Sequence, residues 1–407
     1  MRRRFRNFLP LLSHCTLLLI CCYSAKSFPF LSLFASHKKP FRSTLLTTTT
    51  NNCNEAADAS YTLRLASWNL LAPLYATPMK YASSSPLHLK WDFRQDLIVQ
   101  QLKVIDADIL CLQEVQTDLW PELQRELEML GYTQVCLQNV TRNHPVTVVT
   151  LLRDGVGTFS AVESRSRALI TAIELNHHER NNNKQKTTLF LANVHLEAGM
   201  KENDNETRFF QIRSLLNRLK THIQAEKEKH HVVESNNSND GVDDAPLILV
   251  GDFNMLRDNP IHHLLINGDL PEKEMEELSH RRTTYLPLLP LRDAYLYHQQ
   301  QSEHLTDAAV LEEVATYRGG YVLDYLWTSV GRIKIRETYN VEEILKRSSL
   351  LPAAEDRHDS ASTTTTAASL MTRTTANMPR RRKKRLPWPD GQHPSDHLPI
   401  GATLELW

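Results

Sequence analysis

The chain has 407 residues, of which 41% are hydrophobic and 23% are charged, with 47 Lys+Arg against 47 Asp+Glu. This composition is typical of a globular protein and excludes wholesale disorder, a collagen-like chain and a polytopic membrane protein. The zero net charge conceals an asymmetry. Residues 1–54 hold eight Lys/Arg and no acid, which leaves 39 basic and 47 acidic groups, a net of −8, in residues 55–407. A surface that is basic all over, as nucleic-acid-coating proteins have, is therefore excluded.

The N-terminal segment has the features of a targeting sequence. Arginines cluster within Arg2–Arg6, Leu9–Cys22 is apolar but too short to span a bilayer, and Ala25-Lys26-Ser27 offers small residues for signal-peptidase cleavage. We therefore predict a signal peptide over residues 1–27. Residues 28–55 are rich in basic and hydroxyl side chains, as transit peptides are, or form a disordered segment. We expect entry into the secretory route and onward transport to a plastid, with secretion or a mitochondrial presequence as alternatives, and no membrane span once the leader is removed.

Residues 56–407 are predicted to form one α/β domain, because strand-like apolar runs alternate with amphipathic stretches of helical spacing. The expected strands are Leu63–Asn69, Asp108–Val115, Val146–Leu152, Leu189–Leu196, Leu247–Asn254 and Tyr321–Ser329. The expected helices are Arg94–Ile105, Asp118–Leu130 and Arg208–Ile223.

Three polar segments interrupt this pattern and are predicted to be mobile insertions, at about residues 177–186, 226–244 and 351–385. The last ends in six consecutive basic residues, Arg380–Arg385. This run resembles a nuclear-localisation patch, which conflicts with a signal peptide. It could instead attract polyanions near the substrate entrance, or be a solvated tail without a role.

Polar side chains stand where the apolar runs end, which is where α/β proteins place their sites. The residues in question are Asn69, Glu114, His195, Asp252 and Asn254, joined by Asp324 and by Asp396-His397. Each motif alone has a more common structural interpretation, but their joint placement favours a shared site. Four carboxylates on one rim would raise one another's pKa unless a cation binds there. Oxygen ligands of this kind suit Mg²⁺ or Mn²⁺.

The order of these motifs resembles the endonuclease/exonuclease/phosphatase superfamily. The motifs are Trp68-Asn69, Leu112-Gln113-Glu114-Val115, Asn193-Val194-His195-Leu196, Gly251-Asp252-Phe253-Asn254, Leu323-Asp324-Tyr325 and Ser395-Asp396-His397. Within it, Leu89–Arg94 and Asp106–Gln116 look like the nuclease of the messenger-RNA deadenylase complex, whereas Arg153-Asp154-Gly155 and Leu323–Trp327 look at least as much like nocturnin and the angel proteins. The resemblance implies a four-layer sandwich of two mixed β-sheets flanked by helices.

The resemblance also implies roles for individual residues. Those implied to be catalytic are His195, Asp252, Asn254, Asp324 and His397. Asp252 would orient or deprotonate the water, the two histidines would flank the scissile phosphate, and Asp324 would hold His397 in its tautomer. Those implied to surround the metal are Glu114 as a ligand and Asp396 as a further ligand or an outer contact.

Phosphate binding is expected from amides and guanidinium groups. Asn69 is implied as a neutral donor to phosphate oxygens. Arg153 and Arg208 lie next to catalytic elements in the sequence, where a guanidinium could bind a substrate phosphate in a bidentate manner, or simply be a solvated arginine.

The predicted function is that of a magnesium-dependent phosphoester hydrolase, a deadenylase-like 3′-to-5′ exoribonuclease that acts on single-stranded RNA 3′ ends. The alternative is a nocturnin-like phosphatase that removes the 2′-phosphate of NADP(H) or acts on another phosphorylated nucleotide. A catalytically inactive RNA-binding module is disfavoured, because Glu114, Asp252 and His397 are all retained. Apurinic endonucleases carry an acid at the position of Leu71, which argues against DNA repair and leaves the number of metal ions, one or two, open.

Overall fold

The computed structural model describes residues 61–139, 145–176, 187–231, 245–273, 290–302, 315–349 and 386–407. These residues all belong to one compact unit, Ala56–Trp407. The predicted leader, the insertions at 177–186 and 351–385 and the Arg380–Arg385 run lie outside the described residues. Within the described part, no helix is long and apolar enough to cross a membrane.

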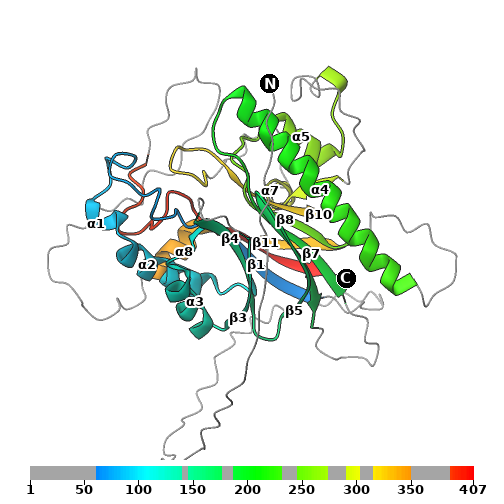
Figure 1. The fold of residues 1–407 in the computed structure, drawn as a ribbon, viewed down its shortest axis with the longest axis horizontal. Helices are drawn as coiled ribbons and strands as arrows, with labels where there is room; N and C mark the ends of the chain where they lie inside the picture. The colour runs from blue at the N-terminus through cyan, green and yellow to red at the C-terminus, as the bar shows by residue number, and fades with distance from the viewer. Residues whose placement is uncertain are drawn as a thin grey trace, which may run out of the picture. The chain divides into compact units, whose positions relative to one another are not determined.

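The first sheet has six strands in the order β11-β12-β1-β2-β4-β3 (Figure 1). Their bounds are β1 Tyr61–Asn69, β2 Ile109–Gln116, β3 Tyr132–Leu137, β4 Val146–Arg153, β11 Ile333–Thr338 and β12 Ile400–Leu406. Strands β1 and β2 run parallel, and the other neighbours in this sheet are antiparallel.

The second sheet also has six strands, in the order β5-β6-β7-β8-β10-β9. Their bounds are β5 Gly157–Arg165, β6 Ala168–Leu175, β7 Thr187–His195, β8 Leu247–Asp252, β9 Leu291–Asp293 and β10 Asp324–Ser329. Strands β7 and β8 run parallel within an otherwise antiparallel sheet. Both sheets are therefore mixed, as predicted.

Most of the helices cover the outer faces of the two sheets. Their bounds are α1 Pro86–Leu89, α2 Trp91–Ile105, α3 Trp120–Met129, α4 Glu202–His231, α5 Pro260–Asn267, α7 Ala294–Ser302 and α8 Val341–Ser349. Figure 1 shows α2, α3 and α8 on one side of the strands and α4 and α5 on the other. Because α4 continues to His231, the first residues of the insertion predicted at 226–244 are helical instead.

Three apolar layers fill the spaces between these elements. One lies between the sheets and includes Leu65, Ile109 and Leu191. A second lies between the first sheet and α2, α3 and α8, and a third between the second sheet and α4 and α5. The predicted four-layer sandwich is thereby confirmed, since each sheet buries one face against the other and one against helices.

Local sequence signals set the ends of the helices. Helix α5 begins after Asn259, whose Oδ1 accepts a hydrogen bond from the backbone N–H of Ile261 at 2.9 Å, and Pro260 occupies the first helical position. It ends at Gly268, which has a φ of 73°, a left-handed conformation that glycine adopts without steric cost.

A polar contact joins the two sheets inside their shared core. The Gln113 Nε2 donates to Asn193 Oδ1 at 2.7 Å, and the Asn193 Nδ2 donates to the Val149 carbonyl at 2.9 Å. Both amides are fully buried, so each hydrogen bond offsets a desolvation cost that apolar side chains would not incur. The contact fixes how the C-terminal ends of β2 and β7 face each other.

Gly251 permits β7 and β8 to approach closely at the same end of the sheet. Its φ is 139°, and a Cβ placed there would lie 2.0 Å from the Val194 carbonyl oxygen. No side chain fits without moving backbone.

We predict that Gly251→Ala lowers the free energy of unfolding by about 3 kcal/mol or more, because strain and a backbone clash combine. Gly155→Ala is the matched control, since Gly155 also has a positive φ of 81° but no heavy atom within 4 Å of the added Cβ. Its expected cost is about 1–2 kcal/mol. Urea denaturation of both variants measures the difference, and equal losses would contradict the prediction.

Candidate active site

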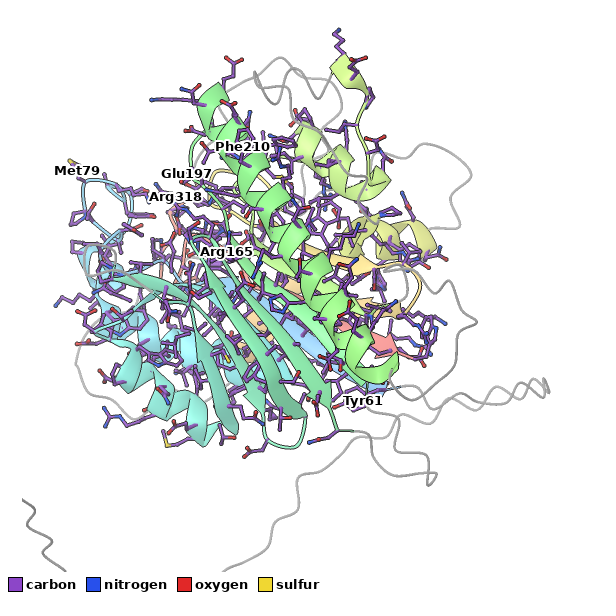
Figure 2. The ribbon with its side chains drawn as sticks, turned by 45° about the vertical axis from the view of Figure 1, so that its right-hand side comes forward. Tyr61, Met79, Arg165, Glu197, Phe210 and Arg318 are labelled. Carbon is purple, nitrogen blue, oxygen red and sulfur yellow. The ribbon has the colours of Figure 1, made fainter. Side chains whose placement is uncertain are left out.

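The predicted site residues meet at one end of the two sheets. Asn69 and Glu114 stand at the C-terminal ends of the parallel strands β1 and β2, and His195 and Asp252 at those of β7 and β8. Strand β10 runs antiparallel to β8, so its first residue, Asp324, pairs with Asp252. The segment that leads into β12 brings Asp396 and His397 to the same end. In Figure 2, Glu197 and Arg318 mark this end, and Tyr61 at the start of β1 marks the opposite one.

Asn69 bridges the two sheets within the site. Its Nδ2 donates to Glu114 Oε1 at 3.2 Å and to Asp252 Oδ2 at 3.0 Å. Its Oδ1 accepts the Leu71 N–H at 3.0 Å, and the second oxygen of Glu114 accepts the Ala72 N–H at 3.0 Å. These contacts fix which end of the amide faces the carboxylates.

The backbone is strained at three positions around this bridge. Glu114, Leu71 and Asn254 have φ values of 53°, 55° and 50°, a region that side-chain-bearing residues enter rarely. Asn254 also supports Asp252, because its backbone N–H donates to Asp252 Oδ1 at 2.9 Å. Its side-chain Nδ2 donates to the Leu196 carbonyl at 3.1 Å and so ties down the loop after His195.

Two histidines flank the Asp252 carboxylate without bonding to it. The Nε2 atoms of His195 and His397 each lie 3.7 Å from Asp252 Oδ2, and His195 Nε2 lies equally far from Glu114 Oε1. The Nδ1 of His397 lies 2.9 Å from Asp324 Oδ2 and forms a hydrogen bond with it. The Nε2 edge of each ring therefore faces the space in which a substrate phosphate or water would be held.

The surroundings give the titratable groups different charges. Burial raises the pKa of Asp252 to about 6, and Asp324 adds to the rise while His397 and His195 oppose it. Burial also raises the pKa of Glu114, with Asp396 adding to it. Burial alone would lower the pKa of His397, but Asp324 and Asp252 outweigh it and hold that pKa well above its usual value. Burial lowers the pKa of His195. At neutral pH, His397 is therefore charged and His195 neutral.

The donor set fits a hard divalent cation. Asp252, Asp324 and His397 place potential ligand atoms within 4.8 Å of one another. However, Asp324 Oδ2 and His397 Nδ1 are directed at each other in the hydrogen bond described above. The Glu114 carboxylate is the more accessible ligand, because 14% of its side chain is exposed against 2% for Asp252. An oxygen-donor site of this kind suits Mg²⁺ or Mn²⁺.

Asp396 belongs to a buried polar cluster beside the histidine. Its Oδ2 accepts a hydrogen bond from the Tyr81 hydroxyl at 2.7 Å, and its backbone carbonyl accepts the Arg318 N–H at 2.8 Å. The Arg318 guanidinium lies 4.0 Å from the centre of the Tyr81 ring. Asp396 thus has a protein partner of its own. The roles of Tyr81 and Arg318 were not predicted, since neither residue ends an apolar run.

Arg94 is a second buried cation near this cluster. Its Nη1 donates to the carbonyls of Leu70 at 2.9 Å and Pro394 at 3.1 Å, which links the loop after β1 to the segment before His397. Burial lowers the pKa of Arg94 to about 10, while Asp396 acts in the opposite direction. The guanidinium therefore fixes two loops that carry site residues, and it moderates the negative charge there.

The prediction that Arg153 binds substrate phosphate is wrong. Strand β4 runs antiparallel to β2, so its last residue lies at the start of β2, at the opposite end from Glu114. There Arg153 pairs with Asp106 and stacks its guanidinium 5.0 Å from the Tyr132 ring centre. The sequence showed a strand end but not the direction of that strand within the sheet.

The structure also gives Arg208 a different role from the predicted one. Arg208 is 1% exposed, and its Nη1 donates to the carbonyls of Glu197 at 2.7 Å and Gly199 at 2.8 Å. It holds the loop that follows His195 onto helix α4. We therefore assign it a positioning role, because its Nη1 donates to two backbone carbonyls and its Nη2 to the Asn205 side chain.

The comparisons with known proteins agree with this geometry. The sequence profile of the Endonuclease/Exonuclease/phosphatase family matches residues 66–397, which span the site from β1 to His397. The chain belongs to this family. The resemblance inferred from the six motifs is thereby confirmed.

A relative of known activity aligns with most of this chain. The CCR4-Not complex 3′-5′-exoribonuclease subunit Ccr4 of Kluyveromyces lactis is 24% identical over 383 residues, which cover 84% of this chain and 41% of that protein. This chain therefore spans less than half the length of that relative.

Two solved structures share the fold. ANGEL2, a 2′,3′-cyclic phosphatase, superposes with a TM-score of 0.55 at 19% identity and covers 85% of this chain and 96% of its own. The human Nocturnin catalytic domain with bound sulfate anion gives a TM-score of 0.50 at 18% identity and covers 85% and 95%.

We predict that Glu114 and Asp396 differ in their effect on metal dependence. Glu114→Gln should raise the Mg²⁺ concentration for half-maximal activity by about tenfold or more, because a carboxylate ligand is lost. Asp396→Asn should lower kcat and leave that concentration within about twofold, because its carboxylate is held by Tyr81. Magnesium titrations of phosphoester hydrolysis measure both, and equal shifts would make Asp396 a ligand.

Proposed function

We propose that this protein is a divalent-metal-dependent phosphoester hydrolase that removes nucleotides from the 3′ end of single-stranded RNA. The observation that carries the proposal is the arrangement of Asp252 between His195 and His397, with Glu114 joined to it through Asn69. Phosphoryl transfer to water needs a positioned nucleophile, neutralised phosphoryl oxygens and a stabilised leaving oxygen. These residues can supply each of them.

Asp252 is placed to orient the attacking water and accept its proton. The Asn69 amide and the Asn254 N–H hold its two oxygens at 3.0 and 2.9 Å, so the carboxylate cannot rotate away. Since burial raises its pKa to about 6, the carboxylate is mostly ionised at neutral pH yet basic enough to take a proton.

His397 is placed to stabilise negative charge on the phosphoryl group. Asp324 bonds its Nδ1, which leaves an Nε2–H free to donate toward the site. His195 enters from the other sheet with a neutral ring and can donate or accept at the opposite side of the phosphate. A bound Mg²⁺ or Mn²⁺, held through Glu114, would supply the remaining positive charge.

The choice of RNA is supported by the Kluyveromyces lactis relative, an exoribonuclease subunit that aligns with 84% of this chain. The second candidate is a nucleotide phosphatase that removes the 2′-phosphate of NADP(H). The net charge of −8 outside the first 54 residues favours it, because tracking a long strand usually requires an extended basic surface. Short 3′ ends and mononucleotide esters are compatible with this charge.

We predict that the full chain shortens oligo(A) from its 3′ end in the presence of Mg²⁺. Excess EDTA should abolish the reaction, and adding back Mg²⁺ or Mn²⁺ should restore it. NADP⁺, assayed in parallel for phosphate release, tests the second candidate. Hydrolysis that persists in excess EDTA would refute metal dependence, and phosphate release from NADP⁺ without shortening of oligo(A) would overturn the RNA assignment.

We further predict that Asp324 and His397 act as a unit. Asp324→Asn and His397→Gln should each lower kcat by roughly 10²-fold or more, and the double variant should lose little beyond the larger single loss. Asp390→Asn and His393→Gln form the control pair, because this Asp–His contact is also 2.9 Å long but lies outside the site. Its variants should retain kcat within about threefold. Multiplicative losses for Asp324 and His397 would show independent roles.

A further inference from the structure

A pocket with arginine side chains adjoins the active site on the second sheet. It is lined by Arg165 at the end of β5, by Ser166 and Arg167 of the turn that follows, by Leu196, and by Gln211 and Ser214 of α4. The turn lies at the catalytic end of the sheet, because Ala168 at the start of β6 pairs with Val194. The backbone N–H of His195 donates to the Arg167 carbonyl at 3.0 Å. Figure 2 shows Arg165 and Glu197 beside helix α4 at this end.

Arg165 shares its one carboxylate partner, Glu163, with two other basic side chains. Its Nη2 donates to the Ser214 hydroxyl at 3.0 Å, and its Nη1 lies 3.4 Å from Glu163 Oε1. That carboxylate is already engaged, because the Arg218 guanidinium donates to both of its oxygens at 2.8 Å and His222 lies 2.7 Å away. The Arg165 side chain is 42% exposed. Its planar edge therefore remains available to an oxyanion.

Arg167 extends the positive charge toward the catalytic residues. Its guanidinium pairs with Glu197 and is 38% exposed. Together with burial, the Arg167 charge lowers the pKa of His195. The same charge opposes the rise in the pKa of Tyr75 that burial and the Glu114 carboxylate cause. Two arginines therefore line a pocket that has no carboxylate in its lining, and the Glu163 carboxylate that pairs with Arg165 is also bound by Arg218.

We propose that this pocket binds a second phosphate of the substrate, the one nearest to the scissile phosphate. The inference rests on the proposed function, since it concerns the same site. In single-stranded RNA this group is the neighbouring backbone phosphate, and in NADP⁺ it is the pyrophosphate. Either presents oxyanions to a guanidinium in a bidentate manner. Arg165 is the principal contact, because its contact with Glu163 is 3.4 Å long and that carboxylate also pairs with Arg218, whereas Arg167 is paired closely with Glu197.

Matched substrate pairs test the proposal with the full chain in Mg²⁺. ApA carries only the scissile phosphate and ApApA one more, and 2′-AMP and NADP⁺ form the corresponding nucleotide pair. Arg165→Gln should raise KM for the member with additional phosphate by about tenfold and leave the other member within about twofold. Arg165→Lys should recover part of the loss. Arg347→Gln is the control, because Arg347 is an exposed arginine of α8 paired with Glu343. It should change neither value.

Equilibrium binding of the same compounds in Ca²⁺ gives a readout that does not require turnover. A preference of the wild-type protein for ApApA or NADP⁺ over its partner, lost in Arg165→Gln, supports the pocket. If that preference appears without hydrolysis of any compound, the proposed function fails and the inference stands. If hydrolysis occurs but affinities within each pair are equal, or Arg165→Gln weakens both members alike, the inference is overturned and the proposed function stands.

Discussion

The site depends on one amide that holds two carboxylates together across the sheets. A single nitrogen of Asn69 contacts Glu114 of the first sheet at 3.2 Å and Asp252 of the second at 3.0 Å. Two carboxylates that contact the same amide nitrogen repel each other when both are ionised. A neutral donor between them offsets part of that repulsion, and it adds no charge that would repel a cation or attract a phosphate. The contact requires β1, β2 and β8 to end at the same level. The sheet registers, the Gln113–Asn193 bond and the close approach at Gly251 all serve this alignment.

The arrangement of the strands also gives the two histidines of the site different protonation states, although their side chains are chemically identical. His397 has Asp324 behind it and Asp252 in front, so its ring holds a proton. His195 stands at the end of β7, where burial and the nearby Arg167 disfavour protonation. One imidazole is thus a charged donor and the other a neutral partner on the opposite side of the same carboxylate. The difference arises from where the antiparallel strand β10 begins, which places Asp324 beside Asp252.

The sequence revealed some strands and the polar residues at their ends more clearly than others. Strands buried on both faces, such as β2 and β8, form continuous apolar runs that end on a polar residue, so both the strand and its functional end are visible. Strand β5 alternates between exposed and partly buried residues at a sheet edge, and β9 has only three residues, so neither stands out. Arg153 was misassigned because strand direction is set by pairing with distant strands. Arg208 was misassigned because burial against Glu197 and Gly199 leaves no local signal.

Charge is divided between two kinds of arginine around the site. Arg94, Arg208 and Arg318 are almost fully buried and donate to backbone carbonyls, so they fix loops rather than bind anions. The side chains of Arg165, at the end of β5, and of Arg167, on the turn after it, are more than a third exposed. Because the buried set is screened from solvent, salt should affect it little, whereas the exposed set acts through water. The loop geometry that the buried arginines maintain should therefore depend little on ionic strength, whereas any attraction of phosphates by Arg165 and Arg167 should weaken as salt is added.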